Sequence, residues 1–420
     1  MSDRKSLPAT IFLITIFLFV GTTLAAASAE KVLYSFKGGD DGANPQAPLV
    51  ADAAGNLYGT TGAGGSSNCE AGCGTVFMLT PPASRNGAWI ETVLYRFLGG
   101  NDAAGPLAGL IFDKAGNLYG ATLSGGGTND GAVFELSPPS APGGSWTETV
   151  LYGFRGGDDG EYPIANLVFD SAGNLYGTTV FGGGAQRPGT IFQLTPPSKL
   201  GGVWTESILH RFGKGNDGAN PIGSLLIDRK GALYGTTMGA YNADGPVFFR
   251  LRPPAPGGKW TESLLYQFNG QSQGDWLGDL IFRAGHLYGT AQLGGDVDNS
   301  GTVFELTPPS PGGVWSEATI HNFAGGDDGN LPNPRLVADH AGSLYGTSQG
   351  GNPGYGTVFK LSPPAAPGGA WVKTTLHQFT GGSDGSAPGA GLIFAKRGAL
   401  YGTTLYGGTS DNGTVYAIVP

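Results

Sequence analysis

The tripeptide Leu-Tyr-Gly recurs seven times along this 420-residue chain, and this repeat constrains the fold more than any other feature. The copies begin at Leu57, Leu118, Leu175, Leu233, Leu287, Leu344 and Leu400. They lie 54 to 61 residues apart, and a near-constant period of this length is the signature of a repeat architecture. We therefore expect one repeat domain, although length alone would suggest two or three domains.

Each repeat contains four strand-like runs bounded by turn residues. In the second copy the runs are 107–113, 118–123, 132–137 and 146–154, and a proline pair follows the third run. Proline cannot donate a hydrogen bond to a strand ladder, so it ends the strand there. No segment has a helical period. Four antiparallel strands repeated seven times predict an all-β, seven-bladed β-propeller.

The two ends of the chain predict how the ring closes. The first repeat is preceded by a lone fourth run, Val32 to Phe36, and the chain finishes on a third run at 413–418 with no fourth run after it. The N-terminal run is therefore expected to be the outer strand of the last blade. This arrangement leaves no open sheet edge.

Residues 1–29 have the pattern of a signal peptide. Arg4 and Lys5 precede an apolar run from Ile11 to Val20, and Ala27-Ser28-Ala29 offers a small-residue cleavage site. Cleavage after about Ala29 would leave residues 30–420 as a single propeller domain, secreted to the periplasm or the extracellular space. The alternative is an uncleaved N-terminal anchor, but the run is shorter than the roughly 20 residues of a membrane span. We expect no stable membrane insertion after cleavage.

Charge and cysteine content exclude some partners. Loss of residues 1–29 removes Asp3, Arg4 and Lys5 and changes the formal net charge from −9 to −10, so we expect no nucleic-acid partner. Cys69 and Cys73 lie in one loop, and an exported chain favours a disulfide between them. No histidine or further cysteine lies nearby in sequence to complete a metal site with them.

Two motifs, Gly-Asn-Leu-Tyr-Gly-Thr-Thr at 55–61 and Gly-Thr-Val-Phe-Met-Leu-Thr-Pro-Pro at 74–82, carry a family resemblance. The sequence from 31 to 420 resembles the Gloeobacter/Verrucomicrobia (GloVer) tandem-repeat family. The resemblance implies an exported, bacterial, β-propeller-like protein and gives no activity. Many such proteins end in a surface anchor, and no such signal is visible here.

An aspartate recurs five residues after a repeated phenylalanine, in the loop that joins each fourth run to the next first run. In one copy Gln273 stands at this position. The other six copies have the aspartate: Asp41, Asp102, Asp159, Asp217, Asp328 and Asp384. The residues fit either ordinary turn chemistry or a ring of carboxylates that binds calcium. Loops on successive blades are expected about 10 Å apart, too far to share one cation, so we expect no cofactor and leave calcium as the alternative.

Aspartates two or three residues before a glycine also recur in the first hairpin, where a turn role is expected: Asp52, Asp113, Asp170, Asp228 and Asp339. Six of the seven tryptophans open the fourth run, and we expect these to pack between outer strands: Trp89, Trp146, Trp204, Trp260, Trp315 and Trp371.

Trp276 is the one tryptophan outside the repeat position, and it lies in the loop that lost its aspartate. An asymmetric ligand needs a departure from ring symmetry, and aromatic rings beside carboxylates suit sugars. The candidate ligand-binding residues are therefore Trp276, Asp275, Tyr241, Asn242, Asp296 and Asp298. The alternative, which the sequence favours, is that Trp276 is exposed without a role.

The histidines do not form a catalytic set. His210, His321 and His377 occupy the tyrosine position of Leu-Tyr-x-Phe, and no nucleophile motif is visible. We therefore assign no catalytic residues and expect a monomeric binding, adhesion or structural module of the cell envelope or extracellular space. Its expected partner is a carbohydrate or another surface protein. The alternative is a secreted hydrolase, lyase or lactonase acting on carbohydrate or small molecules, which rests on fold analogy alone.

Overall fold

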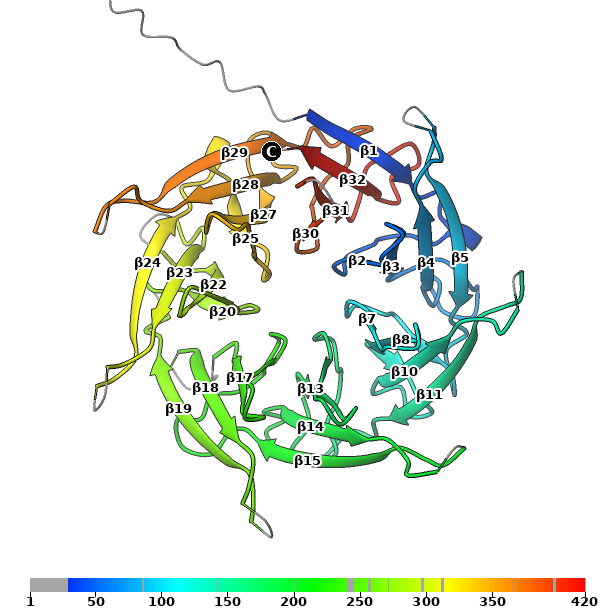
Figure 1. Ribbon diagram of the computed structural model, residues 1–420, viewed down its shortest axis with the longest axis horizontal. Helices are drawn as coiled ribbons and strands as arrows, with labels where there is room; N and C mark the ends of the chain where they lie inside the picture. The colour runs from blue at the N-terminus through cyan, green and yellow to red at the C-terminus, as the bar shows by residue number, and fades with distance from the viewer. Residues whose placement is uncertain are drawn as a thin grey trace, which may run out of the picture.

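The computed structural model describes residues 29–84, 87–141, 143–199, 201–239, 245–255, 258–270, 272–295, 298–310, 313–366, 368–395 and 398–419. These residues form a closed ring of seven antiparallel sheets around a central axis (Figure 1). The described residues contain no α-helix, only the 3₁₀ turns η1 (Gly39–Asp41) and η2 (Gly326–Asp328). The predicted all-β, seven-bladed propeller is thus confirmed.

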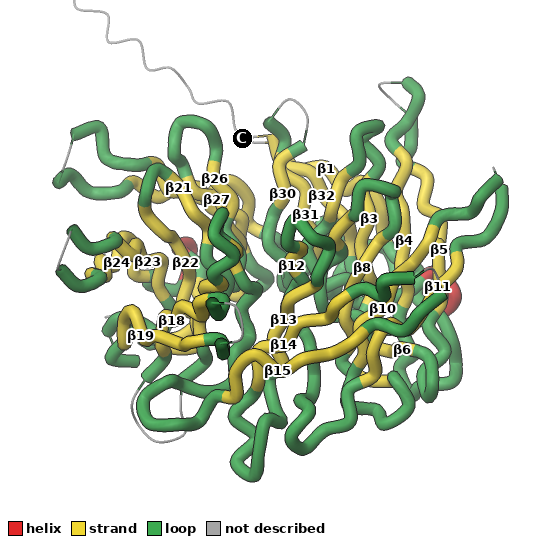
Figure 2. Tube along the Cα trace, turned by 60° about the horizontal axis from the view of Figure 1, so that its bottom comes forward, coloured by secondary structure: helices red, strands yellow, loops and turns green. Residues whose placement is uncertain are grey.

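Each blade has four strands that run in order from the axis to the rim. In the tilted view of Figure 2 these strands form the body of the ring, and loops project from both faces. The innermost strands are β2 (Val50–Ala51), β7 (Ile111–Phe112), β12 (Val168–Phe169), β16 (Leu226–Ile227), β21 (Ile281–Arg283), β26 (Val337–Ala338) and β30 (Ile393–Phe394). The second strands, which carry Leu-Tyr-Gly, are β3 (Leu57–Thr61), β8 (Leu118–Thr122), β13 (Leu175–Thr179), β17 (Leu233–Thr236), β22 (His286–Leu293), β27 (Leu344–Gly350) and β31 (Leu400–Thr404).

The third strands are β4 (Thr75–Thr80), β10 (Ala132–Ser137), β14 (Thr190–Thr195), β18 (Val247–Arg252), β23 (Thr302–Thr307), β28 (Thr357–Ser362) and β32 (Thr414–Val419). The outer strands are β5 (Ile90–Arg96), β11 (Thr147–Gly153), β15 (Thr205–Arg211), β19 (Thr261–Gln267), β24 (Ser316–Asn322), β29 (Val372–Gln378) and β1 (Ala29–Ser35). We number the blades 1 to 7 from the blade of β2 to the blade of β30.

Short pairings beyond the blades place two sets of loops on one face. The loop that enters a blade pairs with the loop between its second and third strands, as in the bridges Ala43↔Ala63, Glu161↔Phe181 and Ser386↔Tyr406. Blades 2, 5 and 6 make the same contact with short strands: β6 (Ala103–Ala104), β9 (Ser124–Gly125), β20 (Asp275–Leu277) and β25 (Asn330–Pro332). These two loop sets therefore share one face of the ring.

The N-terminal strand closes the ring. β1 pairs antiparallel with β32, from Ala29↔Val419 to Ser35↔Thr414, and the backbone N–H of Phe36 donates to Gly413. The closing strand was predicted at Val32 to Phe36, so closure is confirmed and the strand begins three residues earlier. Ala29, the last residue assigned to the signal peptide, already pairs in this strand.

The Leu-Tyr-Gly motif builds each blade through three different contacts, which blade 2 illustrates. Leu118 is fully buried. A Cβ on Gly120 would lie 2.6 Å from Cζ of Phe134, so only glycine lets that ring pack against the second strand. The Tyr119 hydroxyl donates to Asp113, which also accepts the N–H of Asn117 in the hairpin turn. The turn role predicted for this set of aspartates is confirmed.

The hydrophobic cores lie between blades. One core joins Tyr58 and Val76 of blade 1 to Leu118 and Phe134 of blade 2, and six equivalent clusters follow around the ring. Trp146 of blade 2 lies edge-on to Tyr58, with ring centroids 6.5 Å apart. The repeated tryptophans therefore pack between blades as expected, but against residues of the second or third strand of the preceding blade and not against outer strands.

Candidate functional site in the central channel

The repeated loop aspartates are held by their own loops. Asp159, for example, accepts hydrogen bonds from the Tyr152 hydroxyl at 2.8 Å and from the N–H of Arg155 at 2.8 Å. The pairing recurs where histidine replaces tyrosine, as between His210 and Asp217. Among the residues the structure describes, no three His, Cys, Asp or Glu side chains gather as a metal site would need. The loop Cys69–Cys73 contains a disulfide between its two ends.

Each loop aspartate, and Gln273 in its place in blade 5, also faces the outer strand of the next blade. We call each of these seven contacts an outer joint. In five of the seven joints the facing residue is a glutamate with a buried Oε1 that no described group hydrogen-bonds: Glu30, Glu91, Glu148, Glu206 and Glu262. Burial, with repulsion from Asp102, raises the pKa of Glu148 to about 8. Such a shift favours the protonated, uncharged form of the glutamate.

The other two outer joints avoid two facing carboxyl groups in different ways. In blade 5, Nε2 of Gln273 donates to Glu317 at 2.8 Å. In blade 6, Nζ of Lys373 lies 2.9 Å from Asp328. Burial by itself would raise the pKa of Asp328, but hydrogen bonds from His321 and Lys373 lower it. The replacement of aspartate by Gln273 therefore has a structural reason at the rim.

The Trp276 region was the candidate site predicted from sequence. Trp276 is 42% exposed and has a φ of 56°. Burial raises the pKa of Asp275, whose carboxylate accepts the N–H of Trp276. Asp298 is exposed in a loop, also with a positive φ. Tyr241, Asn242 and Asp296 lie outside the described residues, so the predicted group of six stays a prediction.

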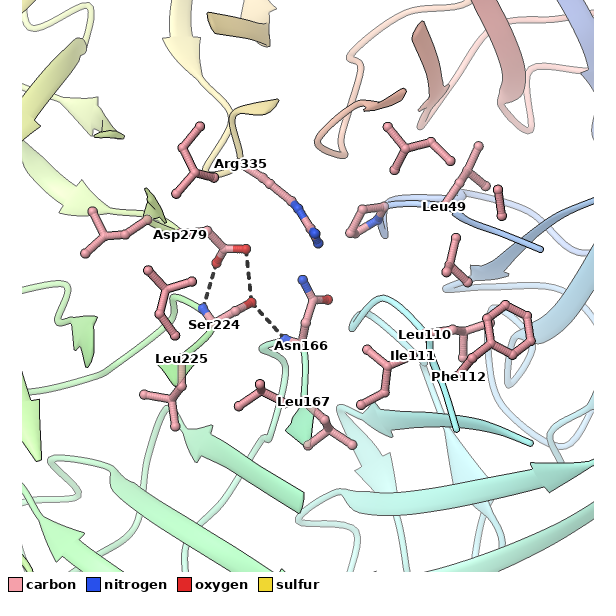
Figure 3. A pocket seen from close by; sticks show the side chains of 18 of the residues that line it. Leu49, Leu110, Ile111, Phe112, Asn166, Leu167, Ser224, Leu225, Asp279 and Arg335 are labelled. Carbon is pink, nitrogen blue, oxygen red and sulfur yellow. Dashed lines mark hydrogen bonds between the residues drawn. The ribbon is translucent and has the colours of Figure 1, made fainter. Parts of the chain in front are cut away.

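A cavity of about 660 Å³ lies on the axis of the ring, lined by residues of six innermost strands and, in blade 6, by Arg335 (Figure 3). Its walls are mostly aliphatic, with Ile111, Val168 and Ile393 among the lining side chains. Polar side chains enter it at one repeat position, two residues before the innermost strand. Around the ring, from blade 1 to blade 7, this position holds Pro48, Gly109, Asn166, Ser224, Asp279, Arg335 and Gly391.

Four consecutive blades therefore each contribute one polar side chain to the channel. We call this set, Asn166, Ser224, Asp279 and Arg335, the polar arc. Three of these side chains accept from the backbone of the preceding blade: Gly109 N–H donates to Oδ1 of Asn166, Asn166 N–H to Oγ of Ser224, and Ser224 N–H to Oδ1 of Asp279. The Ser224 hydroxyl donates to the second oxygen of Asp279 at 3.0 Å. The chain of hydrogen bonds fixes the arc and engages both oxygens of Asp279.

The ends of the arc present donors without acceptors. Among the described residues, no acceptor faces Nδ2 of Asn166 or the guanidinium of Arg335, and both groups point toward the centre of the channel (Figure 3). Gly391 makes room for this arginine, because a Cβ there would lie 2.5 Å from Cβ of Arg335. The arrangement can bind an acceptor group on the axis.

Sequence reasoning missed the polar arc. The signal was present, because the residue before the buried leucine of each first run differs in every repeat except Gly109 and Gly391. The loops also depart from the repeat, as at Gln273 and Trp276, but the departures at the axis fall next to a leucine that every repeat shares.

No described helix is long and apolar enough to cross a membrane. The solved structures similar to this chain include PorZ, a bacterial surface component of the type-IX secretion system of Porphyromonas gingivalis. PorZ is 15% identical with a TM-score of 0.50, over 91% of this chain and 47% of PorZ. This chain thus spans about half the length of PorZ.

Two other similar structures are sialidases, with lower TM-scores. The phage phi92 endosialidase is 9% identical with a TM-score of 0.46, over 93% of this chain and 68% of that one. The Trypanosoma rangeli sialidase is 10% identical with a TM-score of 0.41, over 94% and 59% of the two chains. At such identities the likeness extends to the fold alone.

No protein of curated function matches the sequence. The Gloeobacter/Verrucomicrobia repeat model matches residues 15–183, 71–261 and 249–420, and these segments overlap to span nearly the whole chain. The chain belongs to the Gloeobacter/Verrucomicrobia repeat family.

Proposed function

We propose that this protein is an exported binding module whose ligand site is the central channel. The observation that carries the proposal is the polar arc, which breaks the sevenfold repeat in four neighbouring blades and directs unpaired donors at the axis. A scaffold with a purely structural role has no need of such side chains in a cavity, because unpaired polar groups there add nothing to packing. Channels and clefts with a few convergent polar groups are common ligand sites.

Export is supported by the leader pattern of residues 1–29 and by the Cys69–Cys73 disulfide, since disulfides persist in oxidising compartments. Expression of the full chain in a bacterial host, followed by fractionation and mass spectrometry, tests this part. We expect a mature N-terminus near Glu30 outside the cytoplasm. A full-length, cytoplasmic product would contradict export and leave the channel proposal standing.

Binding in the channel is tested by ligand-observed NMR with a fragment set of neutral, cationic and anionic small molecules. Ala51 lines the channel and is exposed, so Ala51→Trp narrows the channel without disturbing the buried core. We expect fragments that bind wild type to lose binding in Ala51→Trp and to keep it in Trp276→Ala. Absence of any fragment that behaves this way would overturn the proposal.

A second candidate is a carbohydrate site at Trp276, which its 42% exposure beside the half-buried Asp275 favours. Binding to a glycan array by wild type and not by Trp276→Ala would support it. The enzymatic alternative has less support: the lining of the channel includes the single carboxylate of Asp279 and no histidine among the described residues. Hydrolysis by paired carboxylates would need a second such group.

A further inference from the structure

The polar arc and the channel walls together indicate which class of ligand fits, and this inference rests on the proposed binding function. The inward-pointing donors are the guanidinium of Arg335 and the amide NH₂ of Asn166. The orientation of the amide follows from its partner, because Oδ1 accepts the N–H of Gly109 and Nδ2 must then face the other way. A ligand between these two groups has to accept hydrogen bonds.

The backbone adds to this surplus of donors. In blades 2 to 4 the N–H at the arc position is accepted by the side chain of the following blade. The pattern stops after blade 4, because the next blades around the ring have Arg335, Gly391 and Pro48 at the arc position. None of these residues has an acceptor side chain. No described group accepts the N–H of Asp279, Arg335 or Gly391. The side-chain groups of the arc that lack a described partner are therefore both donors, on Asn166 and Arg335.

The side-chain acceptors of Asp279 and Ser224 are already engaged. Both oxygens of Asp279 accept from Ser224, and Oγ of Ser224 accepts from the N–H of Asn166. The cation of Arg335 has no described counter-ion. A planar carboxylate matches a guanidinium through two parallel hydrogen bonds, so the missing partner has the chemistry of a carboxylate.

The remainder of the cavity is apolar. Two residues beyond the arc position, six of the seven blades place an aliphatic side chain in the lining, as with Ile111 and Leu226. One residue further lie Phe112, Phe282 and Phe394, and the rings of Phe112 and Phe394 also pack edge-on against Tyr58 and Tyr345 of the preceding blades. At about 3.3 Å of rise per residue, these rings lie roughly 10 Å along the axis from the arc. Phe282 is 68% exposed within the described structure. An apolar tail about 10 Å long would cover these side chains.

We infer that the channel binds a monocarboxylate with an apolar tail, with the carboxylate between Arg335 and Asn166 and the tail along the innermost strands. Such a ligand supplies the one acceptor that the arc lacks and removes the aliphatic lining from water. Medium-chain fatty acids and aryl-alkanoic acids share this chemistry.

The test uses octanoate, its neutral analogue octanamide and its cationic analogue octylamine as probes. Calorimetric titration of the whole exported protein gives each affinity, and chemical shifts of the innermost strands locate the site. We expect octanoate to bind at least about 10-fold more tightly than octanamide, from the charged hydrogen bonds to Arg335. We expect octylamine to bind more weakly than either probe.

Two variants test the residues that would hold the carboxylate, and a third serves as their control. Arg335→Met keeps the apolar stem and should lower octanoate affinity at least about 10-fold with little effect on octanamide. Asn166→Asp keeps the acceptor for Gly109 and replaces the donor by a negative charge, so octanoate binding should be lost. Arg155→Met removes an equally charged but exposed side chain on the rim and should change nothing. Thermal unfolding of each variant verifies that it is folded.

The outcomes separate this inference from the proposed function. Equal affinity for octanoate and octanamide, or octanoate binding that Arg335→Met leaves unchanged, would overturn the carboxylate inference. If neutral or cationic fragments still bound in the channel, the proposed function would survive that result. If no probe or fragment of any charge bound in the channel, both would be overturned.

Discussion

The outer joint between Glu148 and Asp102 predicts that this propeller loses stability as the pH rises, and that one substitution removes part of the loss. Glu148 lies on β11, and its Oε1 is buried without a described donor. Asp102, which faces it, accepts hydrogen bonds from the Tyr95 hydroxyl and from the N–H of Leu98. Burial and the repulsion from Asp102 therefore favour the protonated form of Glu148.

The sign and size of the effect follow from the pKa of Glu148. Burial and Asp102 raise this pKa from 4.5 to about 8 in the folded protein. Between these values the folded chain keeps a proton that the unfolded chain has lost, so the free energy of unfolding falls as the pH rises from about 4.5 to 8. One unit of pKa difference corresponds to about 1.4 kcal/mol. The side chain is partly exposed, so we take about half of the full value, ~2 kcal/mol.

Glu148→Gln cannot ionise, and its amide can donate to Asp102, as the amide of Gln273 donates to Glu317 at another outer joint. The variant should match wild type within about 0.5 kcal/mol at pH 5 and exceed it by ~2 kcal/mol at pH 8.5. Urea unfolding at constant ionic strength, followed by tryptophan fluorescence, measures both. Wild type itself should weaken over this range, since the pKa values of Glu30, Glu91 and Glu206 are raised to about 7.

The matched control is Glu70→Gln, which makes the same change in net charge at an exposed position. It should show no gain that depends on pH. An equal gain in Glu148→Gln at pH 5 and pH 8.5, or a loss at both, would refute the protonated outer joint. A gain of the same size in Glu70→Gln would assign the effect to net charge alone.

Three further predictions concern the scaffold. Gly120→Ala should lower the free energy of unfolding by about 1 to 3 kcal/mol, because the added Cβ would meet Phe134; an unchanged urea midpoint would contradict the close approach. Trp146→Ala should cost about 3 kcal/mol by the same measurement, since it empties the contact with Tyr58 between two blades, and a cost below 1 kcal/mol would show that the ring is not packed. Trp276→Asn should instead raise the midpoint slightly, by about 1 kcal/mol, because asparagine tolerates the positive φ of this position; a fall in stability would mean that the exposed ring has a packing role.

Local pattern was enough to predict most of the fold. Prolines and glycines ended the strands, so the predicted third run 132–137 coincides with β10, and the fourth run 146–154 is within one residue of β11 at both ends. The first run was predicted too long: 107–113 contains only the two-residue β7. The N–H of Gly109 donates to Asn166 of the next blade and not to β8, so the ladder does not extend to this residue.

The number of blades, the strands within them and the closing strand could be predicted from the sequence, because these depend on periodicity and on turn residues that act within one repeat. Which residues of different repeats lie together follows only from the folded ring. Glu148 and Asp102 are separated by 46 positions, and Asn166 and Arg335 by 169. Whether such residues face one joint or one channel depends on the radius of the closed ring and on the direction of each side chain, which a period along the chain does not specify.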